Sequence, residues 1–500
     1  MRLIILLTLS LLAVTTAGAA PVPPLHHKSA AGLMPAAYLQ SSERALSTQA
    51  AAANSGVLEP YAILPLEQPA TASAGRGRLA AVSTDEQLLR LGWTDGLTVT
   101  QTLPALVAPS GLAVGDLNGD GRSDLLALQR PANKLALAAG SPGGTLAAPT
   151  QHDLPADAEA LLVDDLTADC RRDAAFTALD GTVQVLPQTA DRTLGAARTA
   201  LFANGGATDL AVGDFNHDGQ FDLAALRGTG NTTNHLGLYT IVRDTLTATG
   251  ERSVADGGFA AHAVASGDVT GDGRADLIVS AGGNQPDAYL NLFAQQPSGL
   301  FATTPITMPA WHIPESVAVA DVNHDGHNDV IALHSGWLAL SLYLNQGDGT
   351  LAPYEVYELP YSAAYRPETL TVLDLNEDGG LDVLIADGSR GVTYLLNSDA
   401  APTATIATPI ACTRSLGQRL TIGGTVSGAS VVEVSLDGGA TWEAATVDGT
   451  TWSYTAEVGN RPVYKRVMAR AVEGERVQAP VAETYLRIFN YQQFVPIVGQ

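Results

Sequence analysis

The stretch GDLNGDGRSDLLAL, residues 115–128, places three carboxylates and an asparagine within nine residues and then becomes apolar. Two carboxylates about 4 Å apart repel each other by roughly 4 kcal/mol at an effective dielectric of about 20. Crowding of like charge at the edge of a hydrophobic run therefore predicts a positively charged partner in this loop.

The same pattern occurs six times along the chain, and its leading aspartates recur at intervals of 49 to 54 residues. Each acidic loop lies between two short apolar segments, followed by a third and by a glycine turn that leads to a fourth. Four short strands per roughly 50 residues are typical of a propeller blade. The other copies are DDLTADCRRDAAFTAL from 164, GDFNHDGQFDLAAL from 213, GDVTGDGRADLIVS from 267, ADVNHDGHNDVIAL from 320 and LDLNEDGGLDVLIA from 373.

A seventh, degenerate copy precedes these six. Aligning RLAAV, 78–82, with DLLAL, 124–128, places ATASAGRGR, 70–78, opposite the first acidic loop, with Gly75 at the loop glycine and no carboxylate. We therefore predict an all-β chain with a seven-bladed β-propeller over residues 57–400, whose first blade has lost its ion. Pairing of terminal strands within one blade is expected to close the ring.

The loop spacing D-x-[NT]-x-D-G-x-x-D places side-chain oxygens at positions 1, 3, 5 and 9 and a backbone carbonyl at position 7. Ca²⁺ prefers such hard oxygen ligands, and glycine at position 6 permits the sharp turn around the ion. An EF-hand would need Glu at position 12, where the five complete loops have Ala, Val or Ile. The same residue types also form ordinary Asx turns without a metal.

The sequence predicts about five calcium sites, and weak or absent binding in the second loop, where Cys170 replaces the glycine. The six loops supply 18 of the 51 acidic residues of a chain with a formal charge of -24, so much of this charge is interpreted as metal ligand. The expected ligands, with position 7 acting through its carbonyl, are Asp116, Asn118, Asp120, Arg122, Asp124; Asp165, Thr167, Asp169, Asp173; Asp214, Asn216, Asp218, Gln220, Asp222; Asp268, Thr270, Asp272, Arg274, Asp276; Asp321, Asn323, Asp325, His327, Asp329; and Asp374, Asn376, Asp378, Gly380, Asp382.

These loops, together with turns such as GDGTLAP at 347–353, resemble FG-GAP or VCBS repeat proteins, whose best-known relative is the integrin α-subunit propeller. The resemblance covers about residues 57–400. It implies a seven-bladed propeller with calcium in several blades that serves adhesion, carbohydrate binding or surface recognition. No ligand-binding residues carry over, because no matching motif is present.

The two ends of the chain have different compositions. Residues 1–20 have the features of a secretory signal peptide, and residues 21–56 form an Ala/Pro/Ser-rich linker. Alternating segments predict an Ig-like β-sandwich over 403–495. Its segment 431–447 is similar to the dimerisation domain of molybdopterin oxidoreductases, which implies self-association, and its core SLDGGATW also matches the Asp-box of sialidases. The alternative is a stable hairpin with Trp442 packed in the sandwich core.

Composition and motifs limit the function. Acidic residues outnumber basic ones by 51 to 27, which argues against nucleic acid or anionic membranes as partners. Cys170 and Cys412 are expected to be free thiols rather than a bridge. The chain has no GxSxG, HExxH or P-loop motif. His217, His324 and His327 are expected to face solvent or to offer only a backbone oxygen.

We therefore predict a secreted or cell-surface protein that does not insert into a membrane and that recognises an extracellular protein or glycan without catalysis. No catalytic residue and no organic cofactor site is assigned. The long connections 227–237 and 280–289, together with Trp311 and Trp337, are candidate contact points for a sugar or a protein. The alternative is a carbohydrate-active hydrolase or lyase on a propeller scaffold.

Overall fold

The computed structural model describes residues 55–488 except 77, 105–108, 156, 202–205, 229–233, 243–244, 255–258, 335–336, 338, 361–365, 400, 409–413, 416–418, 458–462 and 480. The expected signal peptide, most of the expected linker and Cys412 lie outside the described residues. The described chain is almost entirely β-strand, with two short 3-10 helices, η1 (Arg130–Ala132) and η2 (Pro367–Thr369). Within it, no helix has the length and apolar character needed to cross a membrane.

Seven four-stranded antiparallel sheets lie in the described residues between 62 and 395. In six of these sheets, strands that are neighbours in the sequence are also neighbours in the sheet. Their bounds are β2 (Ala70–Arg76), β3 (Leu79–Thr84), β4 (Gln87–Trp93), β5 (Leu97–Pro104); β6 (Pro109–Gly115), β7 (Asp124–Gln129), β8 (Lys134–Ala138), β9 (Thr150–Asp153); β10 (Ala158–Asp164), β11 (Asp173–Ala178), β12 (Thr182–Leu186), β13 (Arg198–Leu201); β14 (Asp209–Gly213), β15 (Asp222–Arg227), β16 (His235–Val242), β17 (Thr245–Ser253); β18 (Ala261–Gly267), β19 (Asp276–Gly282), β20 (Ala288–Phe293), β21 (Ile306–Pro309); and β22 (Ser316–Ala320), β23 (Asp329–His334), β24 (Ala339–Tyr343), β25 (Glu355–Glu358).

The last of the seven sheets joins the two ends of this region. It contains β26 (Leu370–Leu373), β27 (Asp382–Asp387) and β28 (Gly391–Leu395), and its outer strand is β1 (Ala62–Pro65) from the beginning of the region. β1 runs antiparallel to β28, with Ala62 opposite Tyr394. The N-terminal segment therefore completes this sheet, which the sequence left undecided.

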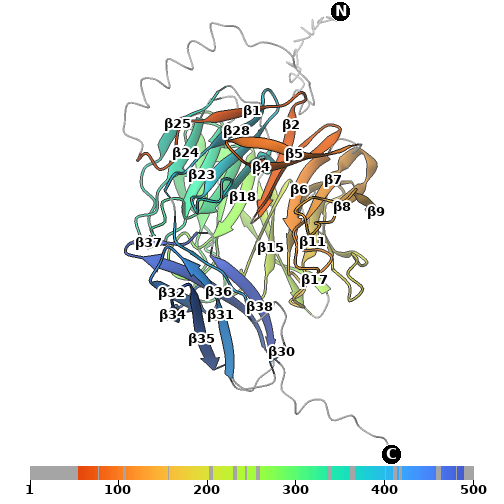
Figure 1. The fold of residues 1–500 in the computed structure, drawn as a ribbon. Helices are drawn as coiled ribbons and strands as arrows, with labels where there is room; N and C mark the ends of the chain where they lie inside the picture. Colours follow the sequence, from red (N-terminus) through yellow and green to blue (C-terminus); the bar gives the residue numbers. More distant parts are fainter. Residues whose placement is uncertain are drawn as a thin grey trace, which may run out of the picture.

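The first strands of successive sheets contact one another around a closed ring (Figure 1). Contacts run in order from β2 to β6, β10, β14, β18, β22 and β26, and β26 returns to β2. Apolar clusters fill the space between neighbouring sheets, so the second strand of a sheet is buried on both faces; all six residues of β7 are buried. This double burial explains why segments such as DLLAL are continuously apolar rather than alternating. The arrangement is of the β-propeller type.

The first sheet corrects one part of the sequence alignment. The alignment places residues 70–78 opposite an acidic loop, but Ala70–Arg76 is strand β2, which pairs directly with β3 so that Arg76 lies opposite Leu79. A hairpin with two connecting residues therefore replaces the nine-residue loop, and Gly75 lies inside a strand. In ATASAGR, alanine alternates with Thr, Ser and Gly, which is a strand pattern. An alignment that matches Gly75 to the loop glycine does not reveal this pattern.

The described residues between 403 and 488 form two further sheets, which we call the C-terminal module. Its core contains Ile422, Val432 and Trp452, whereas Trp442 lies outside that cluster with the Arg470 guanidinium 4.1 Å from its ring centroid. The expectation of a core Trp442 is therefore wrong, and Trp452 has that role. One sheet contains β29 (Thr403–Ala404), β31 (Arg419–Ser427), β35 (Thr451–Glu457) and β34 (Thr446–Asp448); the other contains β30 (Arg414–Ser415), β38 (Ala482–Ile488), β36 (Val463–Glu473), β32 (Val431–Ser435), β33 (Glu443–Ala444) and β37 (Arg476–Val477).

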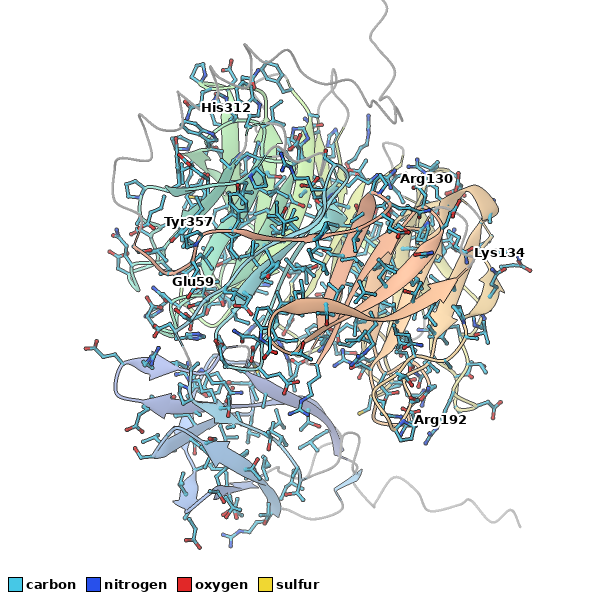
Figure 2. All side chains as sticks on the ribbon, turned by 45° about the horizontal axis from the view of Figure 1, so that its top comes forward. Glu59, Arg130, Lys134, Arg192, His312 and Tyr357 are labelled. Atoms are coloured by element: carbon cyan, nitrogen blue, oxygen red, sulfur yellow. The ribbon has the colours of Figure 1, made fainter. Side chains whose placement is uncertain are left out.

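The ring has two distinct faces because strand direction alternates within each sheet. We call the end with the connections between first and second strands the loop face, and the other end the opposite face. The C-terminal module lies against the loop face, where the Val477 N–H donates to the His324 carbonyl at 2.8 Å. Figure 2 shows His312 and Arg130 at the opposite face and Arg192 at the end nearer the module.

Candidate functional site

The six acidic loops share one backbone conformation on the loop face. Positions 4 and 6 have positive φ in every loop, a region that residues other than glycine occupy at a cost of roughly 1–2 kcal/mol. The sequence predicted the turn at position 6 but gave no sign of the one at position 4. The φ values at positions 4 and 6 are 67° and 80° (Gly119, Gly121), 50° and 67° (Ala168, Cys170), 60° and 84° (His217, Gly219), 71° and 79° (Gly271, Gly273), 60° and 89° (His324, Gly326), and 62° and 95° (Glu377, Gly379).

Position 9 anchors each loop to its own sheet. Its aspartate is at most 4% exposed in all six loops. In the first loop, one oxygen of Asp124 accepts the N–H of position 2 at 2.9 Å, and the other accepts the Gly140 N–H at 2.8 Å, just beyond the third strand. The same bond to the residue beyond the third strand links Asp173 to Gln188, Asp276 to Gln295, Asp329 to Asn345 and Asp382 to Asn397.

Positions 1, 3 and 5 bind the backbone of the loop itself. In the first loop, Asp116 accepts the N–H groups of Asp120 and Gly121, at 3.1 and 2.8 Å. Asn118 also accepts the Asp120 N–H, and Asp120 accepts the N–H of position 7 at 3.0 Å. The loop side chains therefore form a chain of Asx turns, the alternative to metal binding that the sequence left open.

Position 7 divides the loops into two groups. Arg122, Arg171 and Arg274 each donate from Nε to the carbonyl of the residue beyond the third strand and form an ion pair with the aspartate at position 5. The other three loops have Gln220, His327 and Gly380 there. A guanidinium therefore neutralises one carboxylate in three loops.

Burial destabilises the charged form of the anchoring carboxylates and so raises their pKa. Desolvation, with a smaller contribution from the nearby Asp321 and Asp325, raises the pKa of Asp329 to about 7, although the N–H groups of Asn345 and Val322 act in the opposite direction. Desolvation likewise raises the pKa of Asp276 to about 6. Each site would gain from a cation. The pKa is about 7 at Asp173, Asp222, Asp321 and Asp382 as well.

The loops fit a cation only in part. Asp374 Oδ1, at position 1 of the sixth loop, is buried and has no hydrogen-bond partner in the described chain. Within those same residues, no group of three or more His, Cys, Asp or Glu side chains is arranged to hold a metal. A cation in these loops would therefore have to take oxygens that backbone N–H groups now hold.

The histidines and tryptophans differ from expectation at two points. His324 is fully buried beneath the C-terminal module and has a lowered pKa caused mainly by burial, so it does not face solvent. Trp311 is 3% exposed and packs in a core cluster, which leaves it unavailable to stack on a sugar. His217 is exposed, as expected. Trp337 is only partly exposed and stacks on His312, with ring centroids 3.9 Å apart.

A partly buried charge cluster fixes the C-terminal module to the ring. Glu483 of β38 lies 2.5 Å from Arg76, 2.7 Å from Arg466 and 3.6 Å from Arg172. Burial alone would raise the pKa of Glu483, but the three guanidinium groups outweigh it and lower the pKa to about 2. Arg172, at position 8 of the second loop, also pairs with Asp164 at 2.7 Å. The second loop, which lacks the glycine, therefore serves as a docking point.

The ring axis holds a cavity of about 320 Å³ lined by all seven first strands. Two carboxylates reach it, Asp209 at the start of β14 and Glu368 in η2. Burial raises the pKa of Glu368 to about 8, with Asp209 contributing, and raises that of Asp209 to about 7. Sequence reasoning missed both residues, because neither belongs to a repeated motif.

Comparison with known proteins supports the repeat assignment. Residues 268–332 and 321–385 match the FG-GAP-like repeat, and these segments contain the fourth to sixth acidic loops. No curated protein matches the chain significantly. Similar solved structures include Sqt1 of Saccharomyces cerevisiae, which is 12% identical and covers 69% of this chain and 99% of its own, with a TM-score of 0.45. The Pan2 WD40 domain of Neurospora crassa is 11% identical and covers 68% and 94%, with a TM-score of 0.45. Neither likeness bears on function.

Proposed function

We propose that this chain is a secreted, calcium-binding, seven-bladed β-propeller protein with an Ig-like C-terminal sandwich, which recognises an extracellular protein or glycan without catalysing a reaction. The observation that carries the proposal is the repetition of one loop geometry on one face, with a buried aspartate at position 9 each time. A propeller-type fold with FG-GAP-like repeats is itself typical of interaction modules. Adhesion, as in integrin α-subunits, is the closest functional parallel.

Calcium would be held by the side chains at positions 1, 3, 5 and 9 of the five loops that keep the glycine. Bound calcium supplies positive charge to carboxylates that burial and mutual repulsion now destabilise. In the second loop the left-handed Cys170 and the docked Arg172 replace that function. The role of calcium in this proposal is to stabilise the ring, not to take part in a reaction.

Recognition is assigned to the opposite face, which the C-terminal module leaves uncovered. The described ends of the connection 227–237 and the connection 280–289 lie there, and Asn234 of the first and Gly283 of the second lie beside Phe259, which is 42% exposed. Asn234 donates to the Phe259 carbonyl at 2.7 Å, and a Cβ on Gly283 would lie 2.8 Å from the Phe259 ring. An exposed aromatic ring between polar connections suits a sugar or a protein side chain.

Glycan and extracellular-protein arrays, probed in calcium and in EGTA, test this proposal. We expect the arrays to identify a specific ligand. The affinity of Phe259→Ala for that ligand should be about tenfold lower than that of the wild-type protein. Leu300→Ala is the matched control, because Leu300 is 61% exposed in the connection between β20 and β21, on the loop face. Loss of binding in Leu300→Ala as well would contradict the assignment to the opposite face.

The axial cavity favours a second candidate, a carbohydrate-active hydrolase or lyase. Asp209 and Glu368 are two carboxylates in one cavity with raised pKa values, as general acid catalysis requires. A panel of polysaccharide substrates separates the candidates. Turnover that Asp209→Asn abolishes while ligand binding persists would establish the enzyme, whereas binding without turnover supports the recognition module.

A further inference from the structure

The cavity on the ring axis has two chemically different ends. The first strands run from the opposite face to the loop face, so Asp209, at the start of β14, and Glu368, just before β26, lie at the opposite-face end. Arg76, at the end of β2, lies at the loop-face end, where it pairs with Glu483 of the C-terminal module at 2.5 Å. Because the module contacts the loop-face end, a ligand would enter from the opposite face.

The two carboxylates at the opposite-face end have no cationic side chain paired with them. Asp209 is 9% exposed, and its oxygens accept the N–H groups of Leu210 and Val264 at 2.8 and 2.7 Å. Within the described residues, neither Asp209 nor Glu368 forms an ion pair. A carboxylate oxygen has two lone pairs, so each oxygen of Asp209 can accept one further hydrogen bond.

The surroundings of Glu368 favour a cation beside it. Burial raises the pKa of Glu368 to about 8, and Asp209 and Glu159 contribute to this rise, although Arg366 acts in the opposite direction. Glu159 is already paired with Arg130 at 2.5 Å. A positive charge between the two unpaired carboxylates would offset both their burial and their mutual repulsion.

The remaining lining of the axial cavity indicates the type of cation. Its volume of about 320 Å³ exceeds what a bare ion needs and falls at the lower end of the range of small-molecule sites. No described group of three or more His, Cys, Asp or Glu side chains is arranged to hold a metal. The lining therefore suits an organic cation with an apolar body. Its wall is formed by apolar side chains from five first strands, namely Leu112, Leu161, Val264, Val317 and Leu370.

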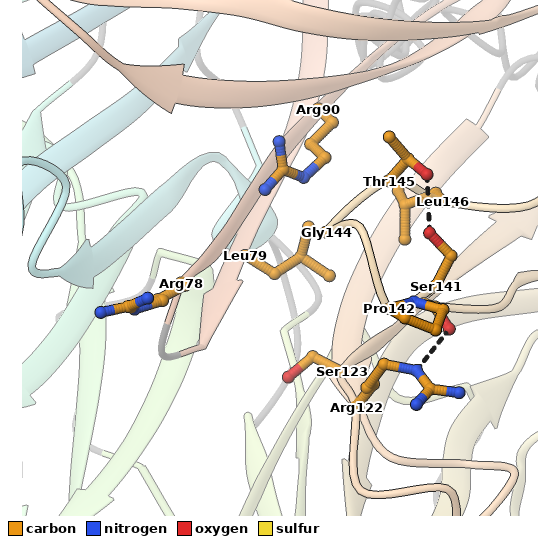
Figure 3. Close-up of a pocket in the computed structure, with 11 residues that line it drawn as sticks. Arg78, Leu79, Arg90, Arg122, Ser123, Ser141, Pro142, Gly144, Thr145 and Leu146 are labelled. Carbon is orange, nitrogen blue, oxygen red and sulfur yellow. Dashed lines mark hydrogen bonds between the residues drawn. The ribbon is translucent and has the colours of Figure 1, made fainter.

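A second cavity of about 320 Å³, between the first two sheets, is lined by arginines (Figure 3). The side chains of Arg78, Arg90 and Arg122 point in different directions there. Arg122 pairs with Asp120 at 2.5 Å. Arg78 pairs with Glu377 at 3.1 Å, and Arg90 donates to a threonine hydroxyl at 2.9 Å. Of the two cavities, the one on the ring axis therefore has the charges that lack partners.

We propose that the axial cavity binds a monovalent organic ammonium ion with an apolar carbon chain, whose charge lies between Asp209 and Glu368. The carbon chain lies along the apolar wall and points towards Arg76. A second positive charge on the ligand would be buried there, close to the Arg76 guanidinium, which disfavours a diamine.

This proposal differs from the two candidate functions above. The site is separate from the recognition surface at Phe259, and it uses Asp209 and Glu368 to bind a charge rather than to transfer a proton to a substrate. An alkylammonium group has a pKa of about 10.4, above that of the Glu368 carboxyl group. The ligand therefore keeps its proton on binding, and Glu368 releases its own to solvent.

Titration calorimetry of the full chain with hexylammonium, hexanol and hexamethylenediamine tests this site. The ionic strength should be about 0.15 M, so that the net charge of the protein is largely screened. We expect hexylammonium to bind, the diamine to bind about tenfold more weakly, and hexanol not to bind. Glu368→Gln should weaken hexylammonium binding by about tenfold or more.

Two control variants make the result specific. Glu358→Gln removes an exposed carboxylate at the end of β25, on the same face but outside the cavity, and should leave hexylammonium binding unchanged. Phe259→Ala should also leave it unchanged, so this proposal and the proposed recognition surface can fail independently.

Four results would overturn the proposal: no binding of hexylammonium, equal weakening in Glu358→Gln and Glu368→Gln, hexanol binding as tightly as hexylammonium, or the diamine doing so. Asp209→Asn should also weaken binding, but it alters the acceptor of the Leu210 and Val264 N–H groups. Glu368 accepts no hydrogen bond from another described residue, so Glu368→Gln tests the site even if Asp209→Asn lowers the melting temperature.

Discussion

The carboxylates on the two faces of the ring have different surroundings. On the loop face, buried carboxylates accept backbone N–H groups, and the C-terminal module covers part of the surface. On the opposite face, Glu368 faces a cavity on the axis, and burial together with Asp209 raises its pKa to about 8. The comparison shows that backbone N–H groups hold the buried carboxylates of the loop face, whereas Glu368 lines a cavity, where burial favours its neutral form.

Removing calcium should have the largest effect, because it acts on the loop face as a whole. We expect the melting temperature to fall by about 10 °C or more in EGTA, since each saturated site contributes roughly 2.7 kcal/mol at a 100-fold excess over its dissociation constant. Differential scanning calorimetry in calcium and in EGTA, with magnesium as the control, measures this fall. An unchanged midpoint would show that the Asx turns alone hold the loops.

Asp329→Ala separates the anchoring role of a loop carboxylate from any metal role. It leaves the N–H groups of Val322 and Asn345 buried without an acceptor, which costs roughly 2–6 kcal/mol of unfolding free energy. Asp325→Ala, at the exposed position 5 of the same loop, is the matched control. Measured by urea unfolding in EGTA, the first change should cost far more than the second. Equal costs would mean that position 9 is not an anchor.

Glu483→Gln tests how the module is held on the loop face. It removes the charge shared by Arg76, Arg172 and Arg466, and breaking this partly buried cluster costs up to about 3 kcal/mol. We expect faster proteolysis of the segment between β28 and β29 and a separate early unfolding transition. Glu443→Gln, in a partly exposed pair with Tyr454, should show neither effect. Unaltered proteolysis in Glu483→Gln would place the docking energy elsewhere.

Glu368→Gln gives the smallest expected effect and tests the opposite face. Because the folded state raises the pKa of Glu368 from 4.5 to about 8, its contribution to stability is fully present below pH 4.5 and is lost as the pH rises towards 8. We expect the difference in melting temperature between pH of about 5 and about 8 to narrow by about 4 °C in Glu368→Gln. Glu358→Gln, on the exposed edge of β25, should keep the wild-type difference.

The repeats predicted most of the ring because local and long-range signals coincide in them. An apolar segment, an acidic turn and a second apolar segment form one hairpin, as in β6 and β7, and copies of a hairpin stack by burying the same residues. Gly121 and its equivalents mark the left-handed turn at position 6. The turn at position 4 gave no such signal, because His217 and Glu377 adopt it without glycine.

The features that the sequence did not predict depend on contacts between segments that lie far apart in the chain. Burial of His324 follows from Val477 of the C-terminal module, and no local pattern near His324 indicates it. The first sheet has a short β2–β3 hairpin where the glycine-based alignment places an acidic loop at residues 70–78. A strand-first alignment of ATASAGR would have found that difference. Trp442 and Trp452 both lie near hairpins, and only packing decides which is buried.

The pairing of β1 with β28 has a consequence for how the chain is made. During synthesis, β1 leaves the ribosome long before its partner exists, so the first segment of the ring must wait unpaired until almost all the other sheets have formed. Once β28 has formed, and before β1 of the same chain pairs with it, β28 presents a free edge that the β1 segment of a neighbouring molecule fits equally well. Crowded nascent chains would therefore exchange this strand, and a covalent link between the two ends would prevent it.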